Sequence, residues 1–276
     1  MLSTARCDME EAAGQSKMSM PARARQAIFP SPTMSQAAIA ACLFGSRVLL
    51  PLVMVQGAAT RRRVPRLSPA KPPHHGLVPG VGKSIRLLAI GESTVCGLGL
   101  ARGDEAIAAT TARALRGLTG RPVAWRADGL SGTTVSDARE QLLCRIVPEP
   151  VDLLVVAFGV NDVTAYRSPA DFADDLVELV TGVRNRVGNA PVVVAGVAPL
   201  NCFPALPWPL RNILGWRSAA LQAAADGLTE RLPLLTVEQI SALEPSLFAS
   251  DGFHPNRRAH AIWGKEIAAL ALPLIR

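Results

Sequence analysis

The sequence predicts a three-layer α/β/α domain with a five-stranded parallel sheet, and two observations support this. From Ile85 onward, short and almost wholly apolar runs alternate with longer amphipathic stretches. Strands that are apolar on both faces indicate a parallel sheet that is covered by helices on both sides. Of the 276 residues, 49% are apolar and 18% are charged, which suits a chain with a large core and excludes a disordered polymer.

The alternating pattern gives each element its expected place. We expect strands at 85–90, 123–127, 153–158, 192–197 and 234–237. We expect helices at 104–118, 135–147, 169–187, 212–231 and 256–274. The third helix has the clearest start, because Ser168 is a good N-cap, Pro169 suits the first turn, and Asp171 lies near the positive end of the helix.

The positive charge is concentrated before the first of these strands. Residues 1–83 hold 11 Lys and Arg against 3 Asp and Glu, whereas residues 84–276 hold 18 against 19. The net charge of +7 therefore belongs to the N-terminal arm. A near-neutral body lacks the clustered basic face of a nucleic-acid-binding protein, so we expect no nucleic-acid partner. Residues 1–36 show no periodicity, and we expect them to be disordered.

An apolar segment at 37–59 admits three interpretations. Its length would nearly span a bilayer, and the following Arg61–Arg63 would keep the body in the cytoplasm and associate residues 37–63 with the membrane. Arg47 and Pro51 argue against a simple span, which leaves a helix packed on the body as the second interpretation. A secretory signal cleaved near the small residues at 57–59 is the third.

Residues 60–83, basic and rich in proline, are expected to form a linker to an independent domain at 84–276. Paired histidines in this stretch lack further ligands, so we expect no metal site there. The cysteines are odd in number and scattered without a C-x-x-C pair, which predicts neither a zinc site nor a disulfide framework: Cys7, Cys42, Cys96, Cys144 and Cys202.

Polar residues follow the expected strands, at the edge where ligands bind in parallel sheets. These residues are Gly91-Glu92-Ser93 after the first strand, Gly132 after the second, Gly159-Val160-Asn161-Asp162 after the third, and Asp251-Gly252-Phe253-His254 before the last helix. A serine hydroxyl becomes a nucleophile when a histidine accepts its proton, and an aspartate can hold that histidine. Backbone N–H groups of Ser93 and Gly132 and the amide of Asn161 could stabilise an oxyanion. The pattern predicts acyl transfer.

These blocks, in this order, resemble the SGNH/GDSL hydrolase family over residues 85–276. The resemblance implies a flavodoxin-like sheet and cofactor-free ester or thioester hydrolysis. It also implies that Ser93 is the nucleophile, His254 the base, and Gly132 and Asn161 oxyanion donors, with Asp251 completing the catalytic set. One position departs from the family: Glu92 stands where Asp is usual, which keeps the charge but changes its reach.

Each position also has a structural alternative. Ser93 could cap a helix, Asn161 could be a turn residue, and Gly129 rivals Gly132 as the donor. The loop at 200–208 is either an apolar wall for an acyl chain or a proline-stiffened cover over the core. The substrate-binding candidates in that loop are Phe203, Leu206 and Trp208.

We therefore expect a serine esterase that acts on a small or lipid-like ester without a metal or cofactor. A thioesterase or a carbohydrate deacetylase is the alternative within the same family. If the protein is not an enzyme, the alternative is a non-catalytic relative that binds an acyl or glycan ligand at the same cleft.

Overall fold

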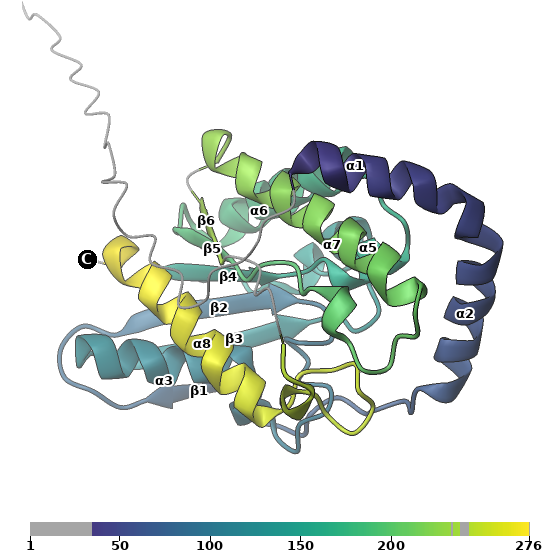
Figure 1. Cartoon of the computed structure of the whole chain (residues 1–276). Helices are drawn as coiled ribbons and strands as arrows, with labels where there is room; N and C mark the ends of the chain where they lie inside the picture. Colours follow the sequence, from purple (N-terminus) through teal and green to yellow (C-terminus); the bar gives the residue numbers. More distant parts are fainter. Residues whose placement is uncertain (1–34, 233, 238–242, 276) are drawn as a thin grey trace, which may run out of the picture. The chain divides into compact units, whose positions relative to one another are not determined.

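In the part of the chain that the structure describes, six strands form one sheet in the order β1-β3-β2-β4-β5-β6, as a computed structural model shows (Figure 1). The described residues are 35–232, 234–237 and 243–275, so the predicted disorder of residues 1–36 falls almost wholly outside them. The strands are β1 (His75–Val78), β2 (Ile85–Gly91), β3 (Val123–Gly129), β4 (Leu153–Ala157), β5 (Val192–Val194) and β6 (Leu234–Thr236).

Strands β2 to β6 run parallel, which confirms the predicted sheet. β2 lies between β3 and β4. The strand that follows β2 in the sequence, β3, is therefore added on one side of it, and β4 and the later strands are added on the other side. Such a reversal opens a crevice at the carboxyl ends of the two strands that flank it. Gly91 pairs with Ala157 at this end, and the loops after β2 and β4 therefore begin side by side.

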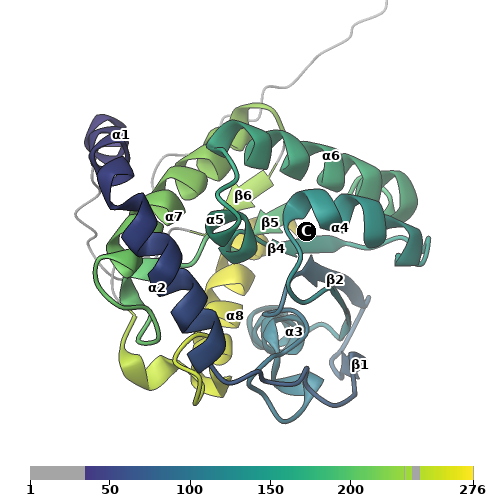
Figure 2. The same cartoon turned by 90° about the vertical axis from the view of Figure 1, so that its right-hand side faces the viewer.

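Helices cover both faces of the sheet, as the sequence predicts (Figure 2). Alternate residues of the strands face opposite sides: Leu88 and Leu154 pack in one core, Leu87 and Leu153 in the other. The first core is closed by α4 (Val135–Gln141), α6 (Pro169–Val187) and α7 (Leu210–Gly227). The second is closed by α3 (Ile107–Thr119) and α8 (Arg257–Ala271).

The structure adds two elements that were not predicted. β1 pairs antiparallel with β3 inside the stretch expected to be a linker, so the sheet has a sixth strand and not five alone. Residues before it also bind the body, since Ala70 N–H donates to the Cys96 carbonyl and Lys71 N–H to that of Ala101. This part of the stretch that was expected to be a linker therefore packs on the body. The other addition is the short helix α5 (Val160–Thr164) directly after β4.

The apolar N-terminal segment is helical, as α1 (Gln36–Gly45), a 3-10 turn and α2 (Leu50–Arg63). The combined helical segment Ala37–Arg63 is long and apolar enough to cross a membrane, and its most apolar stretch has a mean hydropathy of 2.1. The helices contact α7, where Gln56 donates to the Trp208 carbonyl and accepts from Leu210 N–H. Only 11% of that stretch is buried, so most of its apolar surface faces outward.

Candidate active site

The turn before α8 holds Asp251 and His254 together. Oδ2 of Asp251 lies 2.5 Å from Nδ1 of His254, and its Oδ1 accepts the backbone N–H groups of Phe253 and His254 at 3.0 Å. The Asp251 side chain is fully buried, whereas 16% of the His254 side chain is exposed. With Nδ1 held by the carboxylate, the other ring nitrogen of His254 is left to exchange a proton with a substrate or a hydroxyl.

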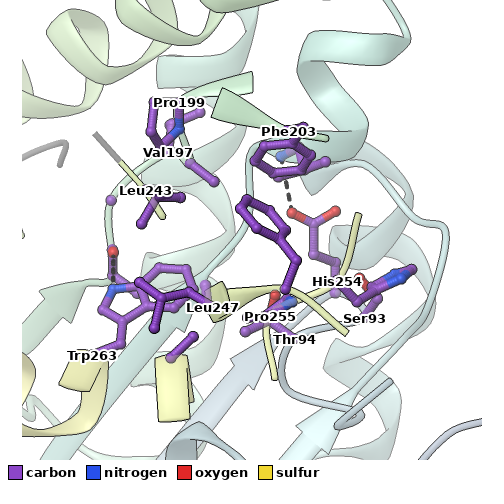
Figure 3. A pocket seen from close by; sticks show the side chains of 18 of the residues that line it. Ser93, Thr94, Val197, Pro199, Phe203, Leu243, Leu247, His254, Pro255 and Trp263 are labelled. Carbon is purple, nitrogen blue, oxygen red and sulfur yellow. Dashed lines mark hydrogen bonds between the residues drawn. The ribbon is translucent and has the colours of Figure 1, made fainter. Parts of the chain in front are cut away.

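Ser93 and His254 line the same cavity, although one follows β2 and the other precedes α8. Figure 3 shows the two side chains beside each other at one end of it. Ser93 lies in the turn after β2, where Leu98 N–H donates to its carbonyl at 3.1 Å. The structure thus brings together the serine, histidine and aspartate that the sequence singled out.

The rest of the cavity is apolar. Three aromatic rings form one wall, with Phe203 in edge contact with both Phe248 and Phe253 at 5.0 Å between centroids. Phe253 in turn contacts the His254 ring at 5.5 Å. The far side is lined by residues from the loop after β5, from the segment that ends in the 3-10 turn Pro245–Leu247, and from α8: Val197, Ala198, Pro199, Leu243, Leu247, Ile262 and Trp263 (Figure 3).

The loop at 200–208 divides its residues between two roles. Phe203 lines the cavity, but Leu206 is buried in the core, and Trp208 is 68% exposed and does not line the cavity. Ala205 N–H donates to the Gly252 carbonyl at 3.1 Å, so this loop braces the turn that carries His254. Both predicted alternatives for the loop are therefore partly present in the structure.

Glu92 joins the loop after β2 to the start of α5. Its Oε1 accepts the Val160 N–H at 2.9 Å, and its Oε2 accepts the backbone N–H of Asn161 at 3.1 Å. The side-chain amide of Asn161 also donates to Oε2. Glu92 is only 3% exposed, and this burial raises the pKa of its carboxyl to about 8, against the lowering effect of the Val160 and Asn161 N–H groups.

Two glycine-dependent features fix the neighbouring loops. Gly159 has φ +135°, and a Cβ there would lie 2.9 Å from the Val197 side chain, so only glycine lets α5 start at this place. Gly132 has φ +82° in the exposed loop between β3 and α4. Asp162, fully buried, accepts the Val135 N–H from that side, and burial raises its pKa to about 6.

The three expected oxyanion donors differ in their partners. Among the described residues, the backbone N–H groups of Ser93 and Gly132 donate to no other group. The amide of Asn161 donates to Glu92 and, at 3.1 Å, to the Thr133 carbonyl. Two donors are therefore available at this edge, and the third is already engaged.

The sequence did not predict the apolar cavity or the contacts of Glu92 with Val160 and Asn161. The cavity lining comes from short apolar stretches after β5 and from α8, which look like ordinary core in the sequence. In the described part of the chain, no cluster of three or more His, Cys, Asp or Glu could hold a metal ion.

Comparisons with known proteins agree with this geometry. A model of the GDSL-like lipase/acylhydrolase family matches residues 89–262, which include Ser93, Gly132, Asn161, Asp251 and His254. The GDSL-like esterase Rv1075c of Mycobacterium tuberculosis is 30% identical over 187 residues. The alignment covers 64% of this chain and 59% of that protein, so the chain spans less than two thirds of its relative.

Solved structures share the fold. A carbohydrate esterase of family 3 from Talaromyces cellulolyticus superposes with a TM-score of 0.51 at 14% identity, covering 69% of this chain and 98% of the other. A putative GDSL-like lipase from Parabacteroides merdae gives a TM-score of 0.51 at 17% identity, covering 76% of this chain and 100% of the other. At these identities the likeness concerns the α/β/α architecture alone.

Proposed function

Because the chain belongs to the GDSL-like lipase/acylhydrolase family, we propose that it hydrolyses carboxylic esters through an acyl-enzyme on Ser93. The observation that supports this most is the hydrogen-bonded Asp251–His254 pair, with Asp251 buried, beside Ser93 in an apolar cavity. Asp251 and His254 are suited to proton transfer, and the cavity is suited to an apolar group of the substrate.

In the proposed reaction, His254 takes the proton of the Ser93 hydroxyl as the oxygen attacks the ester carbonyl. Asp251 stabilises the imidazolium through the bond to Nδ1. The tetrahedral intermediate collapses, the alcohol leaves with the proton from His254, and the acyl group stays on Ser93. Water then attacks the acyl-enzyme while His254 accepts its proton. His254 returns this proton to the Ser93 oxygen as the bond to the acyl group breaks, which releases the acid and restores the serine.

The cavity favours an ester whose acyl part is longer than acetyl. Its lining is almost entirely aliphatic and aromatic beyond Ser93, Glu92 and His254. A sugar would leave its hydroxyl groups without hydrogen-bond partners against such walls, whereas an alkyl chain would bury apolar surface. Among the family's activities, we therefore favour hydrolysis of acyl esters over carbohydrate deacetylation.

A graded series of p-nitrophenyl esters tests this proposal. We expect kcat/KM to be higher for a medium-length acyl chain than for acetate. Ala198→Phe should fill the cavity and reverse that order while leaving the acetate ester a substrate. Ala170→Phe, on the exposed surface of α6, is the matched control and should not change the order. An acetate preference in the unmodified enzyme would contradict the chain-length proposal, and no hydrolysis of any ester would favour a binding protein.

We further propose that α1 and α2 attach the protein to an anionic membrane. Large apolar side chains on these helices and on the 3-10 turn between them face outward, among them Phe44 at 69%, Val48 at 85% and Val55 at 68% exposure. Arg61–Arg63 follow at the end of α2, where they could meet lipid phosphates. This exposed surface disfavours a helix that serves only to pack on the body, because such a helix would bury its apolar side chains.

Vesicle sedimentation of the full chain measures this attachment. Replacing Arg61, Arg62 and Arg63 with alanine should weaken binding to anionic vesicles by about 10²-fold, at about 1 kcal/mol per arginine. The same change at the exposed Arg113, Arg145 and Arg258 is the matched control and should have little effect. Equal losses in both variants, or no binding by the parent chain, would contradict the proposal.

A further inference from the structure

The helix α2 lies beside the start of α7, as Figure 1 and Figure 2 show. Val53, Gln56 and Thr60 form its inner face, and Val53 and Thr60 are buried. Gln56 donates to the Trp208 carbonyl at 2.9 Å and accepts the N–H of Leu210 at 3.2 Å. Leu210 begins α7, which follows the parallel strand β5, so this contact lies at the carboxyl edge of the sheet. The helix is therefore at the same edge as the candidate active site.

The end of α2 approaches the turn that carries His254. Residues 64–70 lead from α2 to the loop after β2. Within this stretch Leu67 lies against Gly99, because a Cβ on Gly99 would be 3.4 Å from Cδ1 of Leu67 and 3.7 Å from Cβ of His254. Leu67 and His254 are thus neighbours of the same glycine. Arg66, which is exposed and directly precedes Leu67, therefore lies close to the catalytic turn.

The loop at 200–208 connects the same turn to the middle of α2. Phe203 lines the cavity, Ala205 N–H donates to the Gly252 carbonyl at 3.1 Å, and the loop ends at Trp208 beside α2. The side chain of Trp208 is exposed. An indole has a large apolar body and a polar N–H, which makes it favourable at the boundary between a membrane and water. Trp208 thus extends the exposed apolar surface of α2 toward the catalytic turn.

The positive charges beside this surface have no counterpart in the described part of the chain. There the guanidinium groups of Arg61, Arg62, Arg63 and Arg66 form no hydrogen bond or ion pair. An anionic bilayer fits both features, because its phosphates can pair with guanidinium groups and its apolar region can take up the exposed side chains. A free phosphate would pair with the arginines but would leave Trp208 in water.

Resting on the proposed esterase function and on attachment through α1 and α2, we infer that Trp208 and Arg66 belong to the membrane-binding surface and hold the catalytic edge against the bilayer, so that the substrates are acyl esters that reside in an anionic membrane. The acyl chain of such an ester passes from one apolar environment into another when it enters the cavity, with little exposure to water. The surface concentrates the ester near Ser93, and the cavity receives its acyl chain.

Hydrolysis of esters in two physical states tests the inference in the full chain. The membrane probe is p-nitrophenyl palmitate in vesicles of phosphatidylcholine and phosphatidylglycerol, and the soluble probe is p-nitrophenyl butyrate. Trp208→Ala keeps the carbonyl that accepts from Gln56. At limiting lipid it should lower vesicle hydrolysis by about tenfold, the loss of one large apolar anchor, and change kcat/KM for the soluble probe by less than about twofold.

Two further variants complete this experiment. Arg66→Ala should lower vesicle hydrolysis by about fivefold, the loss expected for one arginine near an anionic surface, and should leave the soluble probe unaffected. Leu118→Ala is the matched control, because Leu118 is an exposed apolar residue near the end of α3, at the opposite edge of the sheet. It should change the hydrolysis of neither probe.

Tryptophan fluorescence gives a second readout that does not depend on activity. Of the four tryptophans, Trp208 alone is largely exposed, at 68%. Its emission should move to shorter wavelength when the anionic vesicles are added, because the indole leaves water. Inorganic phosphate should cause no such change. The shift should be absent in Trp208→Ala and present in Leu118→Ala.

Three results would overturn the inference: no emission shift in the parent, unchanged vesicle hydrolysis in Trp208→Ala, or equal losses on both probes in that variant. If Trp208→Ala melts below the assay temperature, Arg66→Ala and the emission of the parent decide. Ser93→Ala separates this inference from the proposed function. A parent that hydrolyses neither probe, or does so without Ser93, contradicts the esterase proposal. A Ser93-dependent parent that hydrolyses the soluble probe but does not respond to Trp208→Ala or Arg66→Ala in vesicles contradicts only the membrane-held substrate.

Discussion

Two hydrogen-bonded pairs of the candidate site differ in how far apart their members are in the sequence. Asp251 and His254 lie three residues apart in one turn, whereas Glu92 and Asn161 lie 69 residues apart, after two neighbouring strands. The first pair needs only its own turn, because Oδ1 of Asp251 accepts the N–H groups that close it. The second pair needs the register of β2 with β4, where Gly91 lies opposite Ala157. The geometry of the Asp251–His254 pair thus depends on local structure, and that of the Glu92–Asn161 pair depends on the assembled sheet.

The largest expected effect comes from removing the groups that exchange the proton. Ser93→Ala and His254→Ala should each lower kcat by about 10⁴–10⁶, and the double variant should add little, because both residues act in one step. Turnover of a soluble ester, with a thermal melt to establish folding, measures this. Additive losses would mean that the two residues do not act together.

A subtler change separates the two functions of Asp251. In Asp251→Asn, the remaining oxygen can still accept the N–H groups of Phe253 and His254, so the turn and the Tm should be nearly preserved. The amide cannot stabilise an imidazolium, and we expect kcat to fall by about 10⁴. If the Tm falls while kcat per folded molecule is kept, Asp251 has only a structural role.

The free energy of unfolding should depend on pH because of Glu92, which lies at the carboxyl end of β2. Burial raises the pKa of Glu92 from 4.5 to about 8, so between these values the folded protein keeps a proton that the unfolded chain has released. Raising the pH through this range therefore favours unfolding, and the free energy of unfolding should decline. Glu92→Gln has no such proton and should decline less steeply in Tm from pH 5 to 9. Asp162 is present in both proteins, so its contribution cancels in the comparison. Parallel plots of Tm against pH for the two proteins would contradict a raised pKa of Glu92.

The smallest effect is expected at the N-terminus. A chain that begins at Val64 keeps β1 in the sheet and loses α1 and α2, which contact α7 and leave most of their apolar surface exposed. It should hydrolyse a short soluble ester with kcat/KM within about twofold of the full chain. A chain that begins at Pro79 lacks β1, leaves the edge of β3 unpaired, and should melt lower. Equal melting temperatures of the two shortened chains would mean that β1 adds no stability.

The sequence predicted what depends on short-range pattern. Apolar runs and amphipathic stretches place β2 to β6 and the covering helices, and α6 begins at Pro169 as its capping residues predict. β1 was missed because His75–Val78 is half exposed and surrounded by prolines, which makes it look like a linker. Its pairing with β3 depends on a partner almost fifty residues away.

Within the site, the same distinction holds. Asp251 and His254 are three residues apart and could be paired from the sequence, but the bond from Glu92 to the Asn161 amide depends on side-chain reach across two loops. Leu206 and Trp208 were chosen for apolarity, which does not distinguish a cavity wall from core or from exposed surface. Side-chain direction in an irregular loop is not encoded by a periodic pattern.

The most direct test of the account is covalent labelling of the full chain with a fluorophosphonate, followed by mass spectrometry of the modified peptide. The account predicts one label on Ser93, formed much more slowly in His254→Ala and absent in Ser93→Ala. A label on another residue, or none on a protein that hydrolyses esters, would contradict the assignment of Ser93 as the nucleophile.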